Sequence, residues 1–452
     1  MLALRLTRGS HPAVQLRRLL VAVASAGTGF LLLCTLGYAM SHPDSAAAAA
    51  LRLAWCATPL AATVYFAVAV ARTDPATKPR PGLSAIGLGP GRLMAISATT
   101  TALACTLGSM LALLFFLHLR GDLTGMPFDG AAAEFLASDT PLPLPAALTL
   151  LAIVPVTASV SVALTLRPKD TKHPSTTKNG PRSYGRFGAY GKSGTRETFG
   201  AYGRFGAHLR TGGRTAAVEE TPAPAPATDT EPTATVTGPV DLDPTRPPAP
   251  REVPKGLPWG VAVLAAGLAV EAYANRTADT DGLSMPGGHA GGPAGVLAGW
   301  VLTALGLALA GPGLTHLCGR LLQAVRPGAL RLLAGRVLME EATRIGRPLG
   351  VVCAVASGAY AMTALYDTDA AVGPLTTLGT LLVTGCTVAT LLTAAVEARQ
   401  ARAATTAALV RLGAPATVLR SAAALRAGAL LALFVPLTVV IAELAALPLA
   451  HR

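Results

Sequence analysis

Long apolar blocks with few charges recur along the chain, and each is close to the length of a membrane-crossing helix. A helix that crosses a bilayer needs about 20 apolar residues, because each residue adds about 1.5 Å toward a hydrocarbon core about 30 Å thick. The blocks predict nine spans, at residues 19–40, 53–71, 95–117, 144–165, 258–274, 293–313, 348–366, 373–394 and 427–446. The sequence therefore predicts an all-α, polytopic transmembrane helical bundle of about nine spans, within a range of 8–10.

The overall composition agrees with a membrane protein. Charged residues make up 13% of the 452 residues, against about 25% in soluble domains. The mean hydropathy is +0.49. These values exclude an ordinary soluble enzyme. Ala, Gly and Thr are abundant in the apolar blocks, so neighbouring helices can approach each other closely.

The formal net charge of +13 is distributed unevenly across the predicted membrane. With a cytoplasmic N-terminus, 33 of the 37 Lys and Arg residues fall in cytoplasmic segments. Cytoplasmic loops carry such an excess, and it persists when the long connection between the fourth and fifth spans is left out. We therefore predict a multi-pass protein of the cell membrane with its N-terminus in the cytoplasm and its C-terminus outside. The basic charge reflects topology, so no nucleic-acid partner is expected.

The connection at residues 166–257 has the composition of a disordered cytoplasmic linker. It is basic as far as Arg214, then acidic and rich in proline, with too few aliphatic residues to form a core. A short Tyr-Gly-Arg-Phe-Gly-Ala repeat begins at Tyr184 and again at Tyr202. Its side chains suit single-stranded nucleic acid, anionic lipid headgroups or a solvated tether, of which the tether is favoured.

Catalytic and cofactor motifs do not stand out, so we predict that the chain is not an enzyme and holds no cofactor or metal. The sequence Gly191-Lys192-Ser193 resembles the end of a phosphate-binding loop, but Arg186 occupies the position of its first glycine. No hydrophobic strand precedes this segment either. The six cysteines lack metal-binding or redox spacing and are interpreted as small hydrophobic residues.

A few polar and small residues lie in or beside the predicted spans. Glu443, in the outer part of the ninth span, is the best candidate for a functional charge inside the membrane, although contact with water near the interface is favoured. Glu271 and His118 lie at span ends and are expected to be in contact with water. Small residues at four-residue spacing predict a helix-packing face, inside the protein or between two copies in a homodimer; they are Gly291, Gly295, Gly299 and Thr303.

Two parts of the chain resemble each other, which indicates an internal repeat. Leu88-Gly89 follows the second span, and Leu412-Gly413 follows the eighth, 324 residues later. Leu4-Arg5-Leu6 precedes the first span much as Leu330-Arg331-Leu332 precedes the seventh. Both starts run from inside to outside, so we expect two parallel-oriented repeats.

The chain accordingly divides into four parts. The first membrane half, with four spans, covers residues 1–165, and the linker covers 166–257. A central pair of spans covers 258–313, and the second membrane half, with three spans, covers 314–452.

The segment from Glu397 to Leu425, centred on Leu409-Val410-Arg411-Leu412-Gly413-Ala414, resembles the FtsX-like permeases of ABC transporters, especially duplicated actinobacterial forms. The segment from Leu330 to Ser357 and the first 40 residues are similar to the same family. The resemblance implies a transmembrane permease subunit. An ABC-type ATPase subunit on the cytoplasmic face would then hydrolyse ATP and drive export or extraction of a hydrophobic or amphiphilic substrate.

In that family, the cytoplasmic helix between the second and third spans of a half binds the ATPase. The resemblance implies this role for Leu83–Gly89, here called the first coupling segment, and for Thr405–Gly413, the second coupling segment. The contact residues expected from it are Leu83, Ile86, Leu88, Gly89, Leu409, Arg411, Leu412 and Gly413. Good helix formers from Glu397 onward, followed by Gly413 and Pro415, predict a helix that ends at the second segment. An amphipathic helix at the lipid headgroups is the alternative interpretation.

A second hypothesis is a non-transporting membrane scaffold or regulatory protein derived from a permease. Pro79, Pro81 and Gly87 weaken any helix in or beside the first coupling segment. The loops after the first and seventh spans are about 12 and 6 residues long. They are too short for the large extracytoplasmic domains that are usual in the family. Such a scaffold would use the basic part of the linker to bind membrane lipids or other partners.

Overall fold

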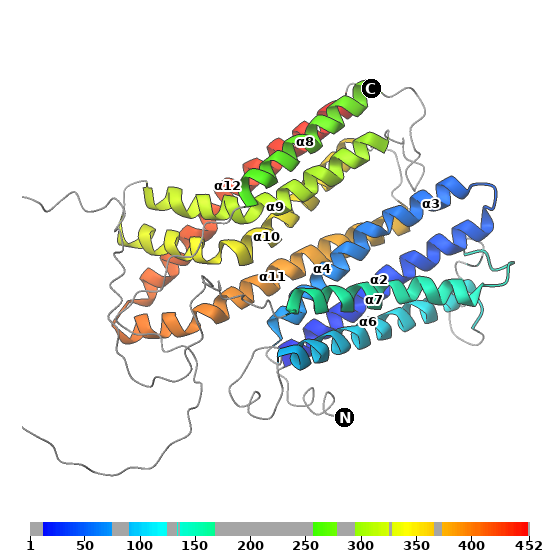
Figure 1. Cartoon of the computed structure of the whole chain (residues 1–452), viewed down its shortest axis with the longest axis horizontal. Coiled ribbons are helices and arrows are strands. Elements are labelled where there is room, and N and C mark those ends of the chain that lie inside the picture. The colour runs from blue at the N-terminus through cyan, green and yellow to red at the C-terminus, as the bar shows by residue number, and fades with distance from the viewer. Residues whose placement is uncertain are drawn as a thin grey trace, which may run out of the picture. The chain divides into compact units, whose positions relative to one another are not determined.

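The computed structural model describes residues 12–74, 90–123, 133, 136–167, 256–277, 294–324, 328–365 and 373–450. All regular secondary structure in these residues is helical, which confirms the predicted all-α class. The helices are α2 (Pro12–Ser41), α3 (Ala46–Trp55), α4 (Ala57–Thr73), α6 (Pro90–Arg120), α7 (Leu144–Leu166), α8 (Gly256–Thr277), α9 (Ala294–Ala324), α10 (Ala329–Leu365), α11 (Pro374–Arg411) and α12 (Ala416–Ala450) (Figure 1). The predicted linker at 166–257 lies almost entirely outside the described residues.

Eight stretches of these helices are long and apolar enough to cross a membrane. Each contains or overlaps one predicted span, so the chain is a multi-pass helical membrane protein. The predicted span at 348–366 lies in α10, apart from its last residue, which falls outside the described set. Because α10 is not among the eight stretches, the ninth span stays a prediction.

The second span contains a helix break that hydropathy did not predict. α3 ends at Trp55 and α4 begins at Ala57, with Cys56 between them. Pro59 follows three residues later and has no backbone N–H to donate to the carbonyl of Trp55. The ladder of helical hydrogen bonds is therefore interrupted near Cys56, and the span consists of two helices.

Several helices extend well beyond their apolar blocks at the end predicted to be cytoplasmic. α9 continues to Ala324, α10 begins at Ala329, α11 continues to Arg411 and α12 begins at Ala416. These extensions are rich in Ala, Leu, Arg and Glu, which are good helix formers. Polar residues lower the mean hydropathy and so end a predicted span, but they do not end the helix.

One set of helices consists of α2, α4, α6 and α7, together with α11 from the distant C-terminal part of the chain. α2 packs along α6 and contacts α4 and α7, while α11 packs against α4 and α2 (Figure 1). Cys386 of α11 lies in the same buried cluster as Val21, Phe66 and Cys105. A helix from the C-terminal part of the chain therefore contributes to the core that the N-terminal helices form.

A second set consists of α8, α9, α10 and α12. α8 packs along α9, α9 along α10, and α12 on α10 (Figure 1). Glycines allow the backbones to approach closely: a Cβ on Gly260 would meet the backbone N of Ala310 at 2.4 Å. A Cβ on Gly306 would meet the N of Leu264 at the same distance, so the α8–α9 contacts run in antiparallel order. Such close contact through small residues stabilises helix pairs that lipid alone would not bring together.

Polar side chains between the helices are used for local contacts. Ser25 Oγ donates to the carbonyl oxygen of Cys105 at 2.8 Å, and the hydroxyls of Thr28 and Thr63 lie 2.8 Å apart. Large apolar side chains face outward instead, with Leu107 of α6 69% exposed and Leu164 of α7 64% exposed. An apolar outer face, with hydroxyls such as these paired inside, suits a hydrocarbon surrounding.

Candidate coupling surface

The second coupling segment forms the exposed end of α11. This helix runs without interruption from Pro374 to Arg411, so the predicted cytoplasmic helix is a continuation of a membrane span. Leu409 is half-buried, whereas Val410 and Leu412 are 55% and 84% exposed. Val410 and Leu412 therefore present two neighbouring apolar side chains at the surface, beyond the apolar block of the helix.

Hydrogen bonds fix the turn after α11. The N–H of Gly413 donates to the carbonyl oxygen of Val410, and the N–H of Ala414 donates to that of Leu409, both at 3.0 Å. Gly413 has φ +86°, which glycine adopts without steric cost. This pair of bonds is the Schellman arrangement, in which carbonyls at a helix end are satisfied by the residues that follow. The predicted stop at Gly413 is therefore confirmed.

A buried ion pair holds α11 against α10 near this end. Arg402 Nε lies 2.7 Å from Glu341 Oε1, and the Glu341 side chain is only 9% exposed. The Nε hydrogen is donated to the carbonyl oxygen of Ala398 at 3.1 Å. Glu341 Oε1 consequently accepts no hydrogen bond from the described residues, so the contact with Arg402 is electrostatic.

Further charges surround this pair. Arg344 of α10 lies 3.9 Å from Glu397 of α11, at more exposed positions. Arg426 of α12 and Arg344 both act electrostatically on Glu341. Charged side chains therefore link α10, α11 and α12 just where these helices leave their apolar blocks. We call Glu341, Arg344, Glu397, Arg402 and Arg426 the charge cluster.

Burial raises the pKa of Glu341 above its ordinary value of 4.5, although Arg402, Arg426 and Arg344 act in the opposite direction. The folded protein therefore binds this proton more tightly than the unfolded chain does. The stability due to this group is complete below pH 4.5 and is lost as the pH rises through the raised pKa.

We expect the unfolding temperature of the wild type to fall relative to that of Glu341→Gln as the pH rises through this window, since glutamine cannot ionise. Thermal unfolding of the detergent-solubilised proteins at a series of pH values measures the difference. Parallel curves for the two proteins would contradict a raised pKa.

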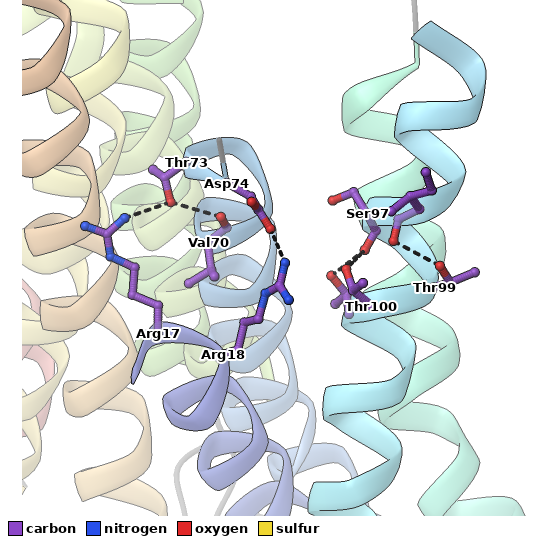
Figure 2. A network of polar contacts seen from close by, with 10 residues as sticks. Arg17, Arg18, Val70, Thr73, Asp74, Ser97, Thr99 and Thr100 are labelled. Carbon is purple, nitrogen blue, oxygen red and sulfur yellow. Dashed lines mark hydrogen bonds and ion pairs between the residues drawn. The ribbon is translucent and has the colours of Figure 1, made fainter. Parts of the chain in front are cut away.

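The first membrane half has a comparable link at the start of α2 and the end of α4. Arg18 Nη2 lies 2.5 Å from Asp74 Oδ2, and Arg17 Nη1 donates to Thr73 Oγ1 at 3.3 Å. Figure 2 shows both arginines reaching from α2 to the last residues of α4, where the Thr73 hydroxyl in turn donates to the carbonyl of Val70. The residues that follow, including Leu83, Ile86, Leu88 and Gly89 of the first coupling segment, lie outside the described residues.

The polar residues beside the spans have different surroundings. Glu443 is exposed and accepts a hydrogen bond from the Tyr360 hydroxyl at 2.6 Å, in agreement with the expected access to water. The same expectation is wrong for Glu271, which is 1% exposed. Its position near a span end did not reveal that it faces α9. Gly295, Gly299 and Thr303 face α8, so the predicted packing face is confirmed inside the protein, whereas Gly291 lies outside the described residues.

The charge cluster was not predicted as a functional group of residues. Glu341 and Arg344 are three residues apart, and Glu397 and Arg402 are five apart, in segments predicted to be cytoplasmic. This spacing could have indicated charged helix faces, but not that the two faces meet. Among the described residues, no three His, Cys, Asp or Glu side chains are placed to hold a metal ion.

Comparison with known proteins adds no relative, since no family model, curated protein or solved structure matches the chain.

Proposed function

We propose that the chain is a permease subunit of an ABC transporter in the cell membrane, with its N-terminus in the cytoplasm. In this proposal a separate ATPase subunit binds the end of α11 and drives export or extraction of a hydrophobic or amphiphilic substrate. The observation that carries it is the exposed apolar end of α11, which continues a membrane span and is followed after a fixed turn by α12.

Helix packing supports the duplicated architecture on which the proposal rests. α2 packs along α6 and contacts α4, and α10 packs along α12 and contacts α11 in the same way. In each group an ion pair links the N-terminal part of one helix to the C-terminal end of another. Arg18 of α2 pairs with Asp74, which directly follows α4, and Glu341 of α10 pairs with Arg402 of α11. Two groups of three helices with the same pairings are expected from parallel repeats.

Force from a cytoplasmic motor would pass into the membrane through the end of α11. Val410 and Leu412 would contact the ATPase, and the Schellman turn would keep the ends of α11 and α12 in a fixed relation. The charge cluster would transfer movement of α11 to α10. Conformational changes of this kind proceed by rigid-body shifts of packed helices, so a stiff connection is required.

The first test is affinity purification of the tagged protein from native membranes in mild detergent, with identification of bound proteins by mass spectrometry. We expect an ATP-binding-cassette subunit in a stoichiometric amount. We also expect Leu412→Glu to reduce its recovery at least tenfold, because a charge would be buried in the interface. The fold should be unaffected, since Leu412 is 84% exposed.

Gln400→Glu is the matched control. It adds the same charge at an exposed position of the same helix, three turns before Leu412, and should leave recovery unchanged. Equal recovery with Leu412→Glu would contradict docking at this site. If no ATPase subunit is recovered with the intact wild type, the permease proposal fails and the scaffold is favoured. The scaffold alternative is supported by the short connection between α10, which ends at Leu365, and α11, which begins at Pro374. A connection of this length is too short to contain a large extracytoplasmic domain.

A further inference from the structure

A buried carboxyl group lies between α8 and α9, away from the coupling surface. Glu271 of α8 is 1% exposed even without lipid around the protein. Its position is about 22 Å along α8 from Gly256, at about 1.5 Å per residue, and within the stretch that is apolar enough to cross a membrane. Ionisable residues inside a membrane are costly and are often retained for ion or proton binding.

The α9 side of this site is formed by a glycine, an indole and a hydroxyl. Gly299 lets the helices approach, since a Cβ there would meet the Cβ of Glu271 at 2.8 Å. Trp300 Nε1 donates to Glu271 Oε1 at 2.6 Å. Thr303 Oγ1 is buried, and a Cβ on Gly267, one turn before Glu271, would meet it at 2.5 Å.

Two polar atoms at this contact have no hydrogen-bond partner among the described residues: Glu271 Oε2 and Thr303 Oγ1. By contrast, the buried hydroxyls of Thr315 and Thr390 each donate to a carbonyl of their own helix. A buried carboxyl oxygen and a buried hydroxyl without partners cost free energy unless they hold a ligand or a proton.

Compensating charge is absent at this position in the described part of the chain. On α9, the charged or titratable groups His316, Cys318 and Arg320 lie more than three helical turns beyond Trp300. On α12, Arg420 and Arg426 lie toward the opposite end, and Glu443 accepts its hydrogen bond from Tyr360. On α8 itself, Tyr273 and Arg276 are exposed. A carboxylate without a counter-ion in this setting would be a buried isolated charge.

We propose that Glu271 is a proton-binding site inside the membrane, formed by the α8–α9 pair. The proton occupies Oε2, while Oε1 stays the acceptor for Trp300. Loss of the proton leaves a charge between closely packed helices, so deprotonation favours separation of α8 from α9 or entry of water. The end of α8 at Thr277 is about 9 Å along the helix from Glu271, at about 1.5 Å per residue, which gives the proton a short exchange path. The site does not depend on the ATPase partner.

The hydrogen bond to Trp300 provides a direct measurement. The chain has three tryptophans, so Trp55→Phe with Trp259→Phe leaves Trp300 as the sole indole. Trp259 is 74% exposed and Trp55 is half-buried, so both changes should be tolerated. We expect the emission of Trp300 in detergent or in vesicles to follow a single pH transition. Adding Glu271→Gln should abolish it, because glutamine keeps an acceptor for the indole but cannot ionise.

Glu443→Gln in the same background is the matched control and should leave the transition unchanged, since Glu443 is exposed and bonded to Tyr360. Infrared difference spectra should show a protonated carboxyl band at neutral pH that Glu271→Gln removes. A transition that persists in Glu271→Gln would overturn the proposal, as would emission that responds to Na⁺ at constant pH. An ionised Glu271 at every pH, with no change in emission, would overturn it as well.

Discussion

Gly311→Ala and Gly350→Ala are each expected to destabilise the protein by about 3 kcal/mol, the upper part of the range for overpacking. A Cβ on Gly311 would lie 2.1 Å from the carbonyl oxygen of Gly346. A Cβ on Gly350 would lie 2.4 Å from the carbonyl oxygen of Leu307. These are backbone atoms, so no side-chain rotation relieves the clash, and α9 and α10 must move apart.

Gly358→Ala supplies the control within the same helix. Gly358 lies eight residues after Gly350 on α10, and a Cβ there would meet nothing within 4 Å. Since alanine is favoured over glycine in a helix by about 1 kcal/mol, this variant should be unchanged or slightly more stable. All six cysteines are buried and free, so a thiol-reactive fluorophore reports unfolding directly. Equal unfolding temperatures for Gly350→Ala and Gly358→Ala would contradict the close packing of α9 on α10.

Arg402→Met is expected to be the most damaging change in the charge cluster. Methionine keeps much of the apolar stem but removes the charge that lies 2.7 Å from Glu341. Removing one partner of a buried ion pair costs about 3–5 kcal/mol. Arg402 is 29% exposed and Glu341 9%, so solvent screening reduces the expected loss to about 2 kcal/mol.

A double-mutant cycle tests this interpretation. Glu341→Gln alone should change stability by less than about 1 kcal/mol, because Arg402 can reach water while the cost of a buried carboxylate is removed. When Glu341→Gln is added to Arg402→Met, it should restore most of the lost stability. Low pH should stabilise the Arg402→Met protein in the same way, because it protonates Glu341. Arg336→Met is the control, since Arg336 pairs at 3.9 Å with Glu340 and both are exposed. If it costs as much as Arg402→Met, burial is not the cause.

Sequence patterns predicted the elements that depend on local chemistry. The apolar blocks predicted the spans because crossing a bilayer requires about 20 apolar residues wherever the helix packs. The end of α11 was predicted as well, since Gly413 and Pro415 follow the helix formers and Gly413 adopts the positive φ of the turn. Neither inference requires knowledge of which helices are neighbours.

Features that depend on helix neighbours were not predicted. Glu271 and Glu443 both lie near span ends, yet one is buried against Trp300 and the other is exposed. The hydropathy of a helix does not say which side faces another helix. The stripe at Gly299 indicated a packing face, but not that its partner would be α8. The pairing of Glu341 with Arg402 also depends on the relative register of α10 and α11.

The position of α11 has a consequence for how the protein is made. The ribosome completes α2, α4, α6 and α7 long before α11, although Cys386 of α11 lies in the core that these helices share. Until then, the side of α4 that packs against α11 has only lipid or an insertion factor beside it. The order of insertion therefore differs from the order of assembly, and the N-terminal group of helices is completed only late in synthesis. A gene interrupted between the codons for residues 169 and 251 is expected to encode two polypeptides that must be produced together to form a stable membrane protein.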